Sequence, residues 1–154
     1  MSLVAVYATG VASTLLHWGR ELGYRTVLVE PDAGRVTAEH RRHADDVVAT
    51  VADASVDATT DAVVTDHHAA DLADHLAALL RTDARWIGLM GSPRHAPPHV
   101  GPLTERGFTG ADIARVRRPI GLDIGSRTPA EIALSTLAGL VADRKGRAGG
   151  VHRA

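Results

Sequence analysis

Short apolar runs rich in β-branched residues alternate with longer helical patterns through most of the chain, and this alternation constrains the fold more than any other feature. We expect buried strands at residues 3–7, 26–30, 46–49, 61–65 and 85–90. Helical patterns cover residues 11–22 and 70–81. Buried strands separated by helices need crossover connections, so they pair in parallel with helices on both faces of the sheet. The sequence therefore predicts a doubly wound, Rossmann-like α/β fold with a mostly parallel sheet, in a single domain.

The second half of the chain starts irregularly and ends in a clear helical pattern. Four prolines and three glycines between residues 91 and 107 shorten or delay any helix there. A short helix is expected within residues 108–116, capped by Thr109. Thr128, Pro129 and Glu131 supply the N-cap, the first-turn proline and the reciprocal carboxylate of a capping box, so a strong helix begins there. We expect a folded domain over residues 1–146 and a disordered tail over residues 147–154.

Composition limits the classes of function. The 154 residues fit one domain, and 17 basic residues nearly balance 18 acidic ones, so no basic patch indicates nucleic acid. The absence of cysteine excludes disulfides, thiolate metal sites and a cysteine nucleophile. The first ten residues lack the features of a signal peptide, and no apolar run approaches the roughly 20 residues of a membrane span. We expect a cytoplasmic protein with neither a membrane nor a nucleic-acid partner.

The stretch "YATGVAS", residues 7–13, leads from the first apolar run into the first helical pattern. A dinucleotide-binding turn at this place needs three small residues, so that the pyrophosphate can reach the free N–H groups of the helix start. Aligned on Gly10, the three positions fall on Ala8, Gly10 and Ser13. A purely structural turn is the alternative. The residues expected to contact a cofactor here are Ala8, Thr9, Gly10, Val11 and Ala12.

Glu30 ends the second apolar run, 20 residues after Gly10. An acidic side chain at this place in a dinucleotide-binding fold meets the ribose hydroxyls. Its charge would repel a 2′-phosphate, so the sequence favours NAD or another adenosine dinucleotide over NADP.

Polar residues follow the fourth run, where the carboxyl end of a parallel strand meets the ligand crevice of a doubly wound sheet. Thr65, Asp66 and His67 are the candidates. Asp66 and His67 offer hydrogen bonds to a ribose or to the amide and amine edges of a pterin. The alternative is that Asp66 only caps the following helix.

Gly91 and Ser92 follow the fifth run and form a second loop at the same edge. Ser92 either caps the next segment or donates a hydrogen bond to a phosphate. The segment 121–127 is expected to bring backbone N–H groups near the ligand, with Arg127 as a candidate anion contact. A dimer-interface or structural pair between Asp123 and Arg127 is an equally good alternative.

No catalytic or metal site is expected. His68, Asp71 and His75 have a spacing that would let them share one helical face and hold zinc or iron, but solvated polar residues at such positions are ordinary. The sequence contains no nucleophile elbow, no thiol and no HExxH motif.

Three stretches resemble a known family: "VVTDHHAADLADHLAALLR", "RWIGLMGSPRH" and, most specifically, "RPIGLDIGSRTPAEIALSTLAGLVA". They are similar to the C-terminal Rossmann domain of the xanthine dehydrogenase accessory family (XdhC/CoxF-like proteins). The resemblance implies a dimeric domain in proteins that bind molybdenum cofactor and deliver it to molybdenum hydroxylases. The family's N-terminal domain, which carries a cysteine implicated in holding the cofactor, has no counterpart here. The expected partners are therefore a second copy of the chain, a cysteine-bearing chain, or the recipient hydroxylase.

The chain departs from the family pattern at three places. Ala8-Thr9-Gly10 stands where the family usually has Gly-Ala-Gly, and Thr65-Asp66-His67-His68 exchanges the two middle types of the usual Thr-His-Asp-His. Prolines at 93, 97 and 98 replace a basic helix. We expect a maturation accessory protein that is not an enzyme; the alternatives are a small NAD-dependent oxidoreductase or a non-catalytic NAD-binding regulatory module.

Overall fold

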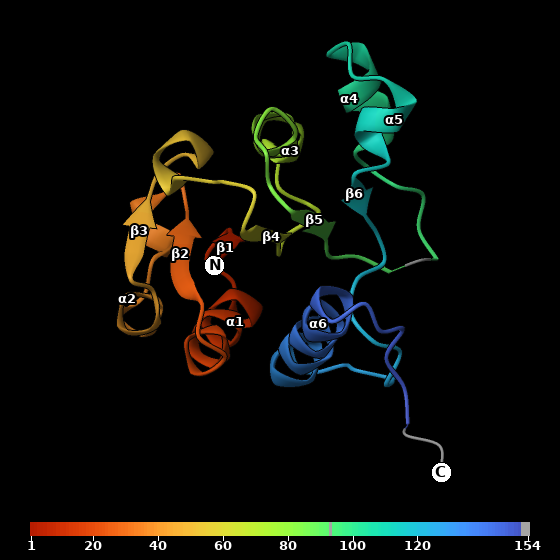
Figure 1. The fold of residues 1–154 in the computed structure, drawn as a ribbon. Helices are drawn as coiled ribbons and strands as arrows, with labels where there is room; N and C mark the ends of the chain where they lie inside the picture. The colour runs from red at the N-terminus through yellow and green to blue at the C-terminus, as the bar shows by residue number, and fades with distance from the viewer. Residues whose placement is uncertain (93, 152–154) are drawn as a thin grey trace.

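Six parallel strands form one sheet in the computed structural model, which describes residues 1–92 and 94–151 (Figure 1). The strands lie in the order β3-β2-β1-β4-β5-β6, so the direction of strand addition reverses between β1 and β4. The predicted doubly wound Rossmann-like fold is thereby confirmed. The strands are β1 (Ser2–Val6), β2 (Arg25–Val29), β3 (Asp46–Val48), β4 (Thr60–Val64), β5 (Trp86–Leu89) and β6 (Val116–Arg117).

Helices cover both faces of the sheet, because successive strand side chains point to opposite faces. On one face Val4 and Val6 of β1 pack beneath α3 (Leu72–Leu80), α4 (Val100–Glu105) and α5 (Gly110–Ile113) (Figure 1). On the other face Leu3 and Ala5 pack beneath α1 (Gly10–Glu21), α2 (Ala38–His43) and α6 (Pro129–Arg144). Two short 3-10 turns, η1 (Ala33–Arg35) and η2 (Val51–Ala54), complete the connections.

The capping residues act as the sequence predicts. The Thr128 hydroxyl accepts from the Glu131 N–H, and the Glu131 carboxylate accepts from the Thr128 N–H at 3.0 Å. Thr109 and Asp112 form the same reciprocal pair at the start of α5. These local contacts fix where two helices begin.

Apart from the two 3-10 turns, the structure contains three elements that the sequence did not predict: helix α2 before β3, helix α4 within residues 91–107, and strand β6, whose Val116 was expected in the short helix at 108–116. Helix α4 occupies Val100–Glu105, and the two-residue strand β6 pairs Val116 with Ile87 of β5. The expected tail begins after α6. Its last three residues, 152–154, lie outside the described residues.

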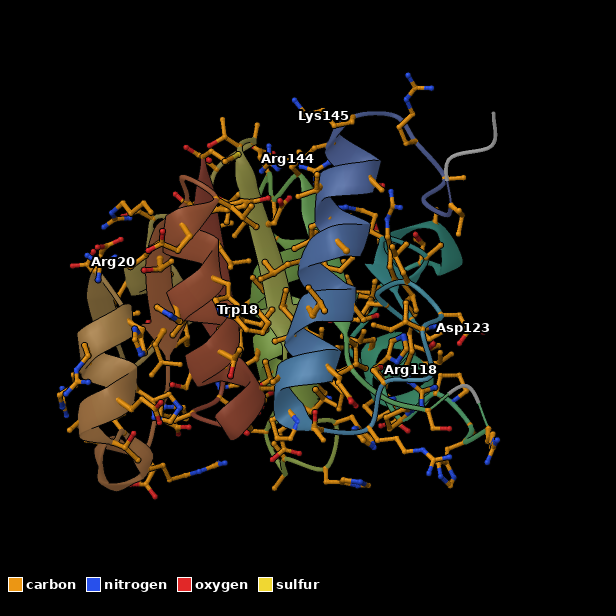
Figure 2. All side chains as sticks on the ribbon, turned by 90° about the horizontal axis from the view of Figure 1, so that it is seen from below. Trp18, Arg20, Arg118, Asp123, Arg144 and Lys145 are labelled. Atoms are coloured by element: carbon orange, nitrogen blue, oxygen red, sulfur yellow. The ribbon has the colours of Figure 1, made fainter. Side chains whose placement is uncertain are left out.

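Helices α1 and α6 lie side by side across one face of the sheet, with Trp18 between them (Figure 2). Both start at the carboxyl edge of the sheet. Their first turns lie so close that a Cβ atom added to Gly10 would stand 3.8 Å from the Cβ of Pro129. The amino-terminal ends of two long helices therefore flank the switch point between β1 and β4.

Candidate functional site

A cavity of about 640 Å³ lies at the carboxyl edge of the sheet, between α1, α6 and the ends of β4 and β5. This volume is in the range of small-molecule sites, and a switch point is where doubly wound folds bind ligands. The lining residues come from four parts of the chain: Val11 from α1; Thr65, His67, Met90, Gly91 and Ser92 from the strand ends; Pro119, Ile120, Gly121, Leu122, Asp123 and Ser126 from the segment before α6; and Ile132, Ser135 and Thr136 from α6 itself.

Close packing of the segment before α6 forms one wall of the cavity. Gly121 has a φ of +87°, and a side chain there would collide with Ser135 and the Thr136 backbone. The Leu122 N–H donates to the Ser135 carbonyl at 3.1 Å, and the Ser135 hydroxyl donates back to the Leu122 carbonyl. A glycine at 121 is therefore what lets this segment lie directly on the helix.

Five of the residues predicted from the sequence meet in this cavity: Val11, Thr65, His67, Gly91 and Ser92. Seven others do not line it: Ala8, Thr9, Gly10, Ala12, Glu30, Asp66 and Arg127. Four lining residues belong to the segment 121–127 that the sequence placed near a ligand: Gly121, Leu122, Asp123 and Ser126. The sequence reasoning missed Pro119, Ile120 and the α6 side chains. The glycine-punctuated stretch before a strong helix was the only available signal for them.

The backbone of the first turn bends sharply just before the three small positions that the sequence predicts. Tyr7, not Ala8, takes the left-handed conformation, with φ of 76°. Thr9 is the N-cap of α1, and its hydroxyl accepts from the Ala12 N–H at 3.1 Å and donates to the Thr65 hydroxyl at 2.9 Å. Ala12 is fully buried. The sharp bend thus falls on Tyr7, one residue before the first of the three small positions expected at Ala8, Gly10 and Ser13.

Glu30 turns its carboxylate toward the backbone of the same turn. One oxygen accepts from the Ala8 N–H at 2.8 Å and the other from the Asp32 N–H at 2.9 Å. The side chain is fully buried, with the Arg35 guanidinium 3.7 Å away. The carboxylate therefore holds two loops in place in this structure.

The positions of the Thr9 and Glu30 side chains decide whether NAD fits the first turn in the usual way. The Thr9 side chain stands at the helix start, where the usual mode leaves room for a pyrophosphate, and Glu30 is covered where that mode exposes a carboxylate to the ribose. The turn as it stands does not fit the usual dinucleotide mode. Nucleotide contacts at Ala8, Thr9, Gly10, Ala12 and Glu30 remain predictions.

Asp66 and Arg127 make local backbone contacts. Asp66 accepts from the His68 N–H at 2.9 Å, which stabilises the turn before α3, while the N-cap of α3 itself is Asp71. The Arg127 N–H donates to Glu131 at 2.8 Å. Within residues 1–92 and 94–151, no ion pair joins Asp123 to Arg127.

Gly91 and Ser92 form one wall of the cavity, the Gly91–Ser92 wall, and the Arg118 guanidinium lies behind it. The Arg118 guanidinium donates to the Ser92 carbonyl at 2.8 Å and to the His95 carbonyl at 3.2 Å. Burial lowers the pKa of His67, and the neighbouring His68 and Arg118 lower it further. Burial, then Arg118, likewise lowers the pKa of His99. Sequence reasoning missed Arg118, because the two-residue strand β6 that precedes it cannot be recognised from a local pattern.

The spacing of His68, Asp71 and His75 does not make a metal site. Helix α3 begins at Leu72, so His68 lies in the preceding turn and off the helical face. His75 Nε2 lies 3.1 Å from the Asp71 carboxylate, which also accepts from the Tyr7 hydroxyl at 2.9 Å. Across the residues that the structure describes, no three His, Cys, Asp or Glu side chains are arranged to hold a metal ion.

A parallel doubly wound sheet with a cavity at its switch point defines a Rossmann-type domain. More specifically, the sequence pattern of the XdhC Rossmann domain matches residues 3–140, so the chain belongs to that family.

Two known proteins are similar to this chain. A protein of Bacillus halodurans, described as a xanthine dehydrogenase, has a crystal structure that superposes with a TM-score of 0.76 at 23% identity, over 95% of this chain and 43% of that one. The uncharacterized protein YqeB of Escherichia coli K12 is 36% identical over 76 residues, which are 49% of this chain and 14% of that protein. This chain therefore spans less than half the length of either. Among the described residues, none of the helices has the length and apolar character to cross a membrane.

Proposed function

We propose that the chain is an accessory domain in the maturation of molybdenum hydroxylases of the xanthine dehydrogenase or CO dehydrogenase type. Membership of the XdhC Rossmann-domain family is the observation that carries this proposal. The similarity to a protein described as a xanthine dehydrogenase supports the same connection. The domain binds a small ligand, either molybdenum cofactor or a nucleotide, and aids insertion of the cofactor into the recipient enzyme.

The cavity suits a ligand of this kind. Its size and its mixed lining allow an apolar or aromatic ring system to be buried while polar groups bind its edges. His67, Ser92 and Asp123 are the side chains that would orient such a ligand. Molybdenum cofactor would be cargo here, with its metal chemistry carried out later in the hydroxylase.

A dinucleotide-binding module is the second candidate function. It is favoured by an acidic residue directly after β2 and by a glycine at the first position of α1. Calorimetry with NAD separates the two candidates. Saturable NAD binding below millimolar concentration favours the second, and its absence favours a ligand specific to the cavity.

Deletion of the gene tests the proposed maturation role. In the deletion strain we expect molybdenum hydroxylase activity to fall while the amount of hydroxylase protein is unchanged, because the enzyme would lack functional cofactor. Restoring the gene on a plasmid should restore the activity. Full hydroxylase activity in the deletion strain would contradict the proposal.

A further inference from the structure

Arg118 differs from the other half-buried arginines in having no carboxylate partner. Of the arginines that the structure describes, Arg85, Arg118 and Arg144 are half-buried. Arg85 and Arg144 both form ion pairs with the buried Asp61. Arg118 forms no ion pair with any described residue and donates only to backbone carbonyl groups. Since partial burial of an uncompensated charge is costly, its retention here calls for an explanation.

The sequence around Arg118 is adapted to keep the guanidinium at one end of the cavity. A Cβ atom added to Gly91 would lie 2.8 Å from Nε and 3.0 Å from a terminal nitrogen of Arg118, so the guanidinium packs directly on this glycine. Gly91, Ser92 and Pro119 all line the cavity, and Arg118 contacts or adjoins each of them. Figure 2 shows Arg118 beside the amino-terminal half of α6, on the same side as Asp123. The positive charge therefore lies immediately behind the Gly91–Ser92 wall.

Three buried side-chain nitrogen atoms have no hydrogen-bond partner among the described residues, and one of them, on Arg85, lies elsewhere. The other two are the Nε of Arg118 and the Nδ1 of His99. His67, which lines the cavity, feels the positive charge of Arg118 as well. A bound anion would compensate the positive charge of Arg118.

We propose that the Gly91–Ser92 end of the cavity binds an oxyanion, most directly a phosphoryl group. Arg118 supplies the compensating charge, the Ser92 hydroxyl supplies a hydrogen bond, and His67 adds charge when protonated. This inference rests on the proposed function only in taking the cavity as the ligand site. It places the anion of the ligand at the β5 side of the switch point, away from the first turn and its capping Thr9.

Titration of the purified full chain with inorganic phosphate, followed by the amide NMR signals, tests this placement. We expect saturable shifts at Gly91 and Ser92. Arg118→Gln should weaken binding by about tenfold or more, because it removes the positive charge behind the Gly91–Ser92 wall. The matched control Arg41→Gln removes the same charge from an exposed position on α2, outside the cavity lining, and should change the affinity by less than about twofold. Equal losses in both variants, or shifts confined to residues 10–12, would overturn the proposal.

Two further measurements address folding and the source of the anion. If circular dichroism shows that Arg118→Gln is unfolded, Arg118→Lys decides the matter: binding within about threefold of the parent is expected, and a folded Arg118→Lys that does not bind would refute the site.

An adenosine monophosphate titration separates free phosphate from a nucleotide, because only a nucleotide would also shift signals along the α6 wall. A phosphate affinity equal to that of the nucleotide identifies the anion alone as the ligand.

The pH dependence of sulfate binding gives a readout that a structural role of Arg118 would not produce. Sulfate keeps the same charge between pH 5.5 and 8, whereas His67 gains a proton on acidification. The groups that face His67 are His68, His95, Arg118 and Asp66, and Asp123 is the carboxylate of the cavity lining. We expect sulfate to bind more tightly at pH 5.5 than at pH 8, and His67→Gln to remove most of this difference. A pH-independent affinity in the parent would contradict the role of His67. None of these outcomes alters the gene-deletion result, so failure of the anion site is distinct from failure of the maturation role.

Discussion

Single residues decide how the first turn is used, and Thr9 is the clearest case. Its hydroxyl satisfies the Ala12 N–H and links α1 to Thr65 at the end of β4. Threonine is a favoured N-cap residue, so the start of α1 was readable from the sequence. The hydrogen bond from Thr9 to Thr65 joins residues 56 positions apart and could not be predicted from the sequence.

Thr9→Gly should improve nucleotide binding. The change removes the hydroxyl that stands at the helix start, and glycine replaces a cap at a cost of only a few tenths of a kcal/mol. We expect calorimetry to show tighter NAD binding than in the parent chain. Thr128→Gly, which removes the equivalent cap of α6, is the control and should leave NAD affinity unchanged. NAD affinity that does not rise in Thr9→Gly would mean that the first turn is closed to phosphate for other reasons.

His99 should make the stability of the fold depend on pH. Its pKa in the folded chain is lowered by burial and by Arg118. On acidification His99 is protonated near pH 6.5 in the unfolded chain but only at lower pH in the folded chain. The free energy of unfolding should therefore fall as the pH drops from 7 to 5. His99→Gln should reduce this fall in urea titrations at the two pH values, whereas His95→Gln, at an exposed position, should not. An identical fall in the parent and in His99→Gln would contradict this assignment.

At the scale of elements, local signals predicted the helix starts and most strands well. Apolar runs placed β1, β2, β4 and β5 to within about a residue of their bounds, because continuous burial of a parallel strand needs a continuous apolar run. The strand β6 could not be predicted, since its two residues are defined only by pairing with β5. The cavity wall at 119–123 likewise depends on contact between Gly121 and α6, which no local pattern reports.

The element most dependent on one side chain is the carboxyl end of α6. The fully buried Asp61 on β4 accepts from Tyr24 at 2.9 Å and pairs with Arg85 at 2.7 Å and Arg144 at 2.8 Å. Asp61→Asn leaves the two guanidinium groups without this charge, so we expect the free energy of unfolding to drop by about 3 kcal/mol. Urea denaturation measures it. Asp46→Asn breaks only the exposed pair with Arg25 and should cost less than about 1 kcal/mol. Similar losses in the two variants would show that the Asp61 cluster contributes little.

At the scale of the whole molecule, the topology located the site more reliably than the motif did. The carboxyl edge was predictable, because ligands of doubly wound sheets bind there. Which side of the switch point holds the cavity was not, since this depends on α6 lying beside α1 and on the wall that precedes it. The residues predicted from the β4 and β5 ends therefore meet in the cavity, whereas most of those from the first turn do not.

Dimer formation is a further prediction at this scale. Leu134 and Val141 lie seven residues apart on one side of α6, with exposed fractions of 52% and 38%, and apolar side chains in this arrangement favour burial against a partner. We expect sedimentation at tens of micromolar to show a dimer, and the double variant Leu134→Glu/Val141→Glu to be a monomer. Leu22→Glu, at an exposed apolar position on the loop after α1, should remain a dimer. A monomeric parent chain would rule the prediction out.

The proposed maturation role is tested most directly by asking whether filling the cavity stops delivery of molybdenum cofactor to the hydroxylase. Ile132 lines the cavity from α6, and Ala130 lies on the same helix at an exposed position outside the lining. Genes for Ile132→Trp and Ala130→Trp are returned to the deletion strain, both variants are checked for folding by circular dichroism, and the molybdenum content of the purified hydroxylase is measured per protomer. We expect Ala130→Trp to restore the molybdenum content and folded Ile132→Trp not to restore it. Full restoration by Ile132→Trp would contradict the proposed maturation role.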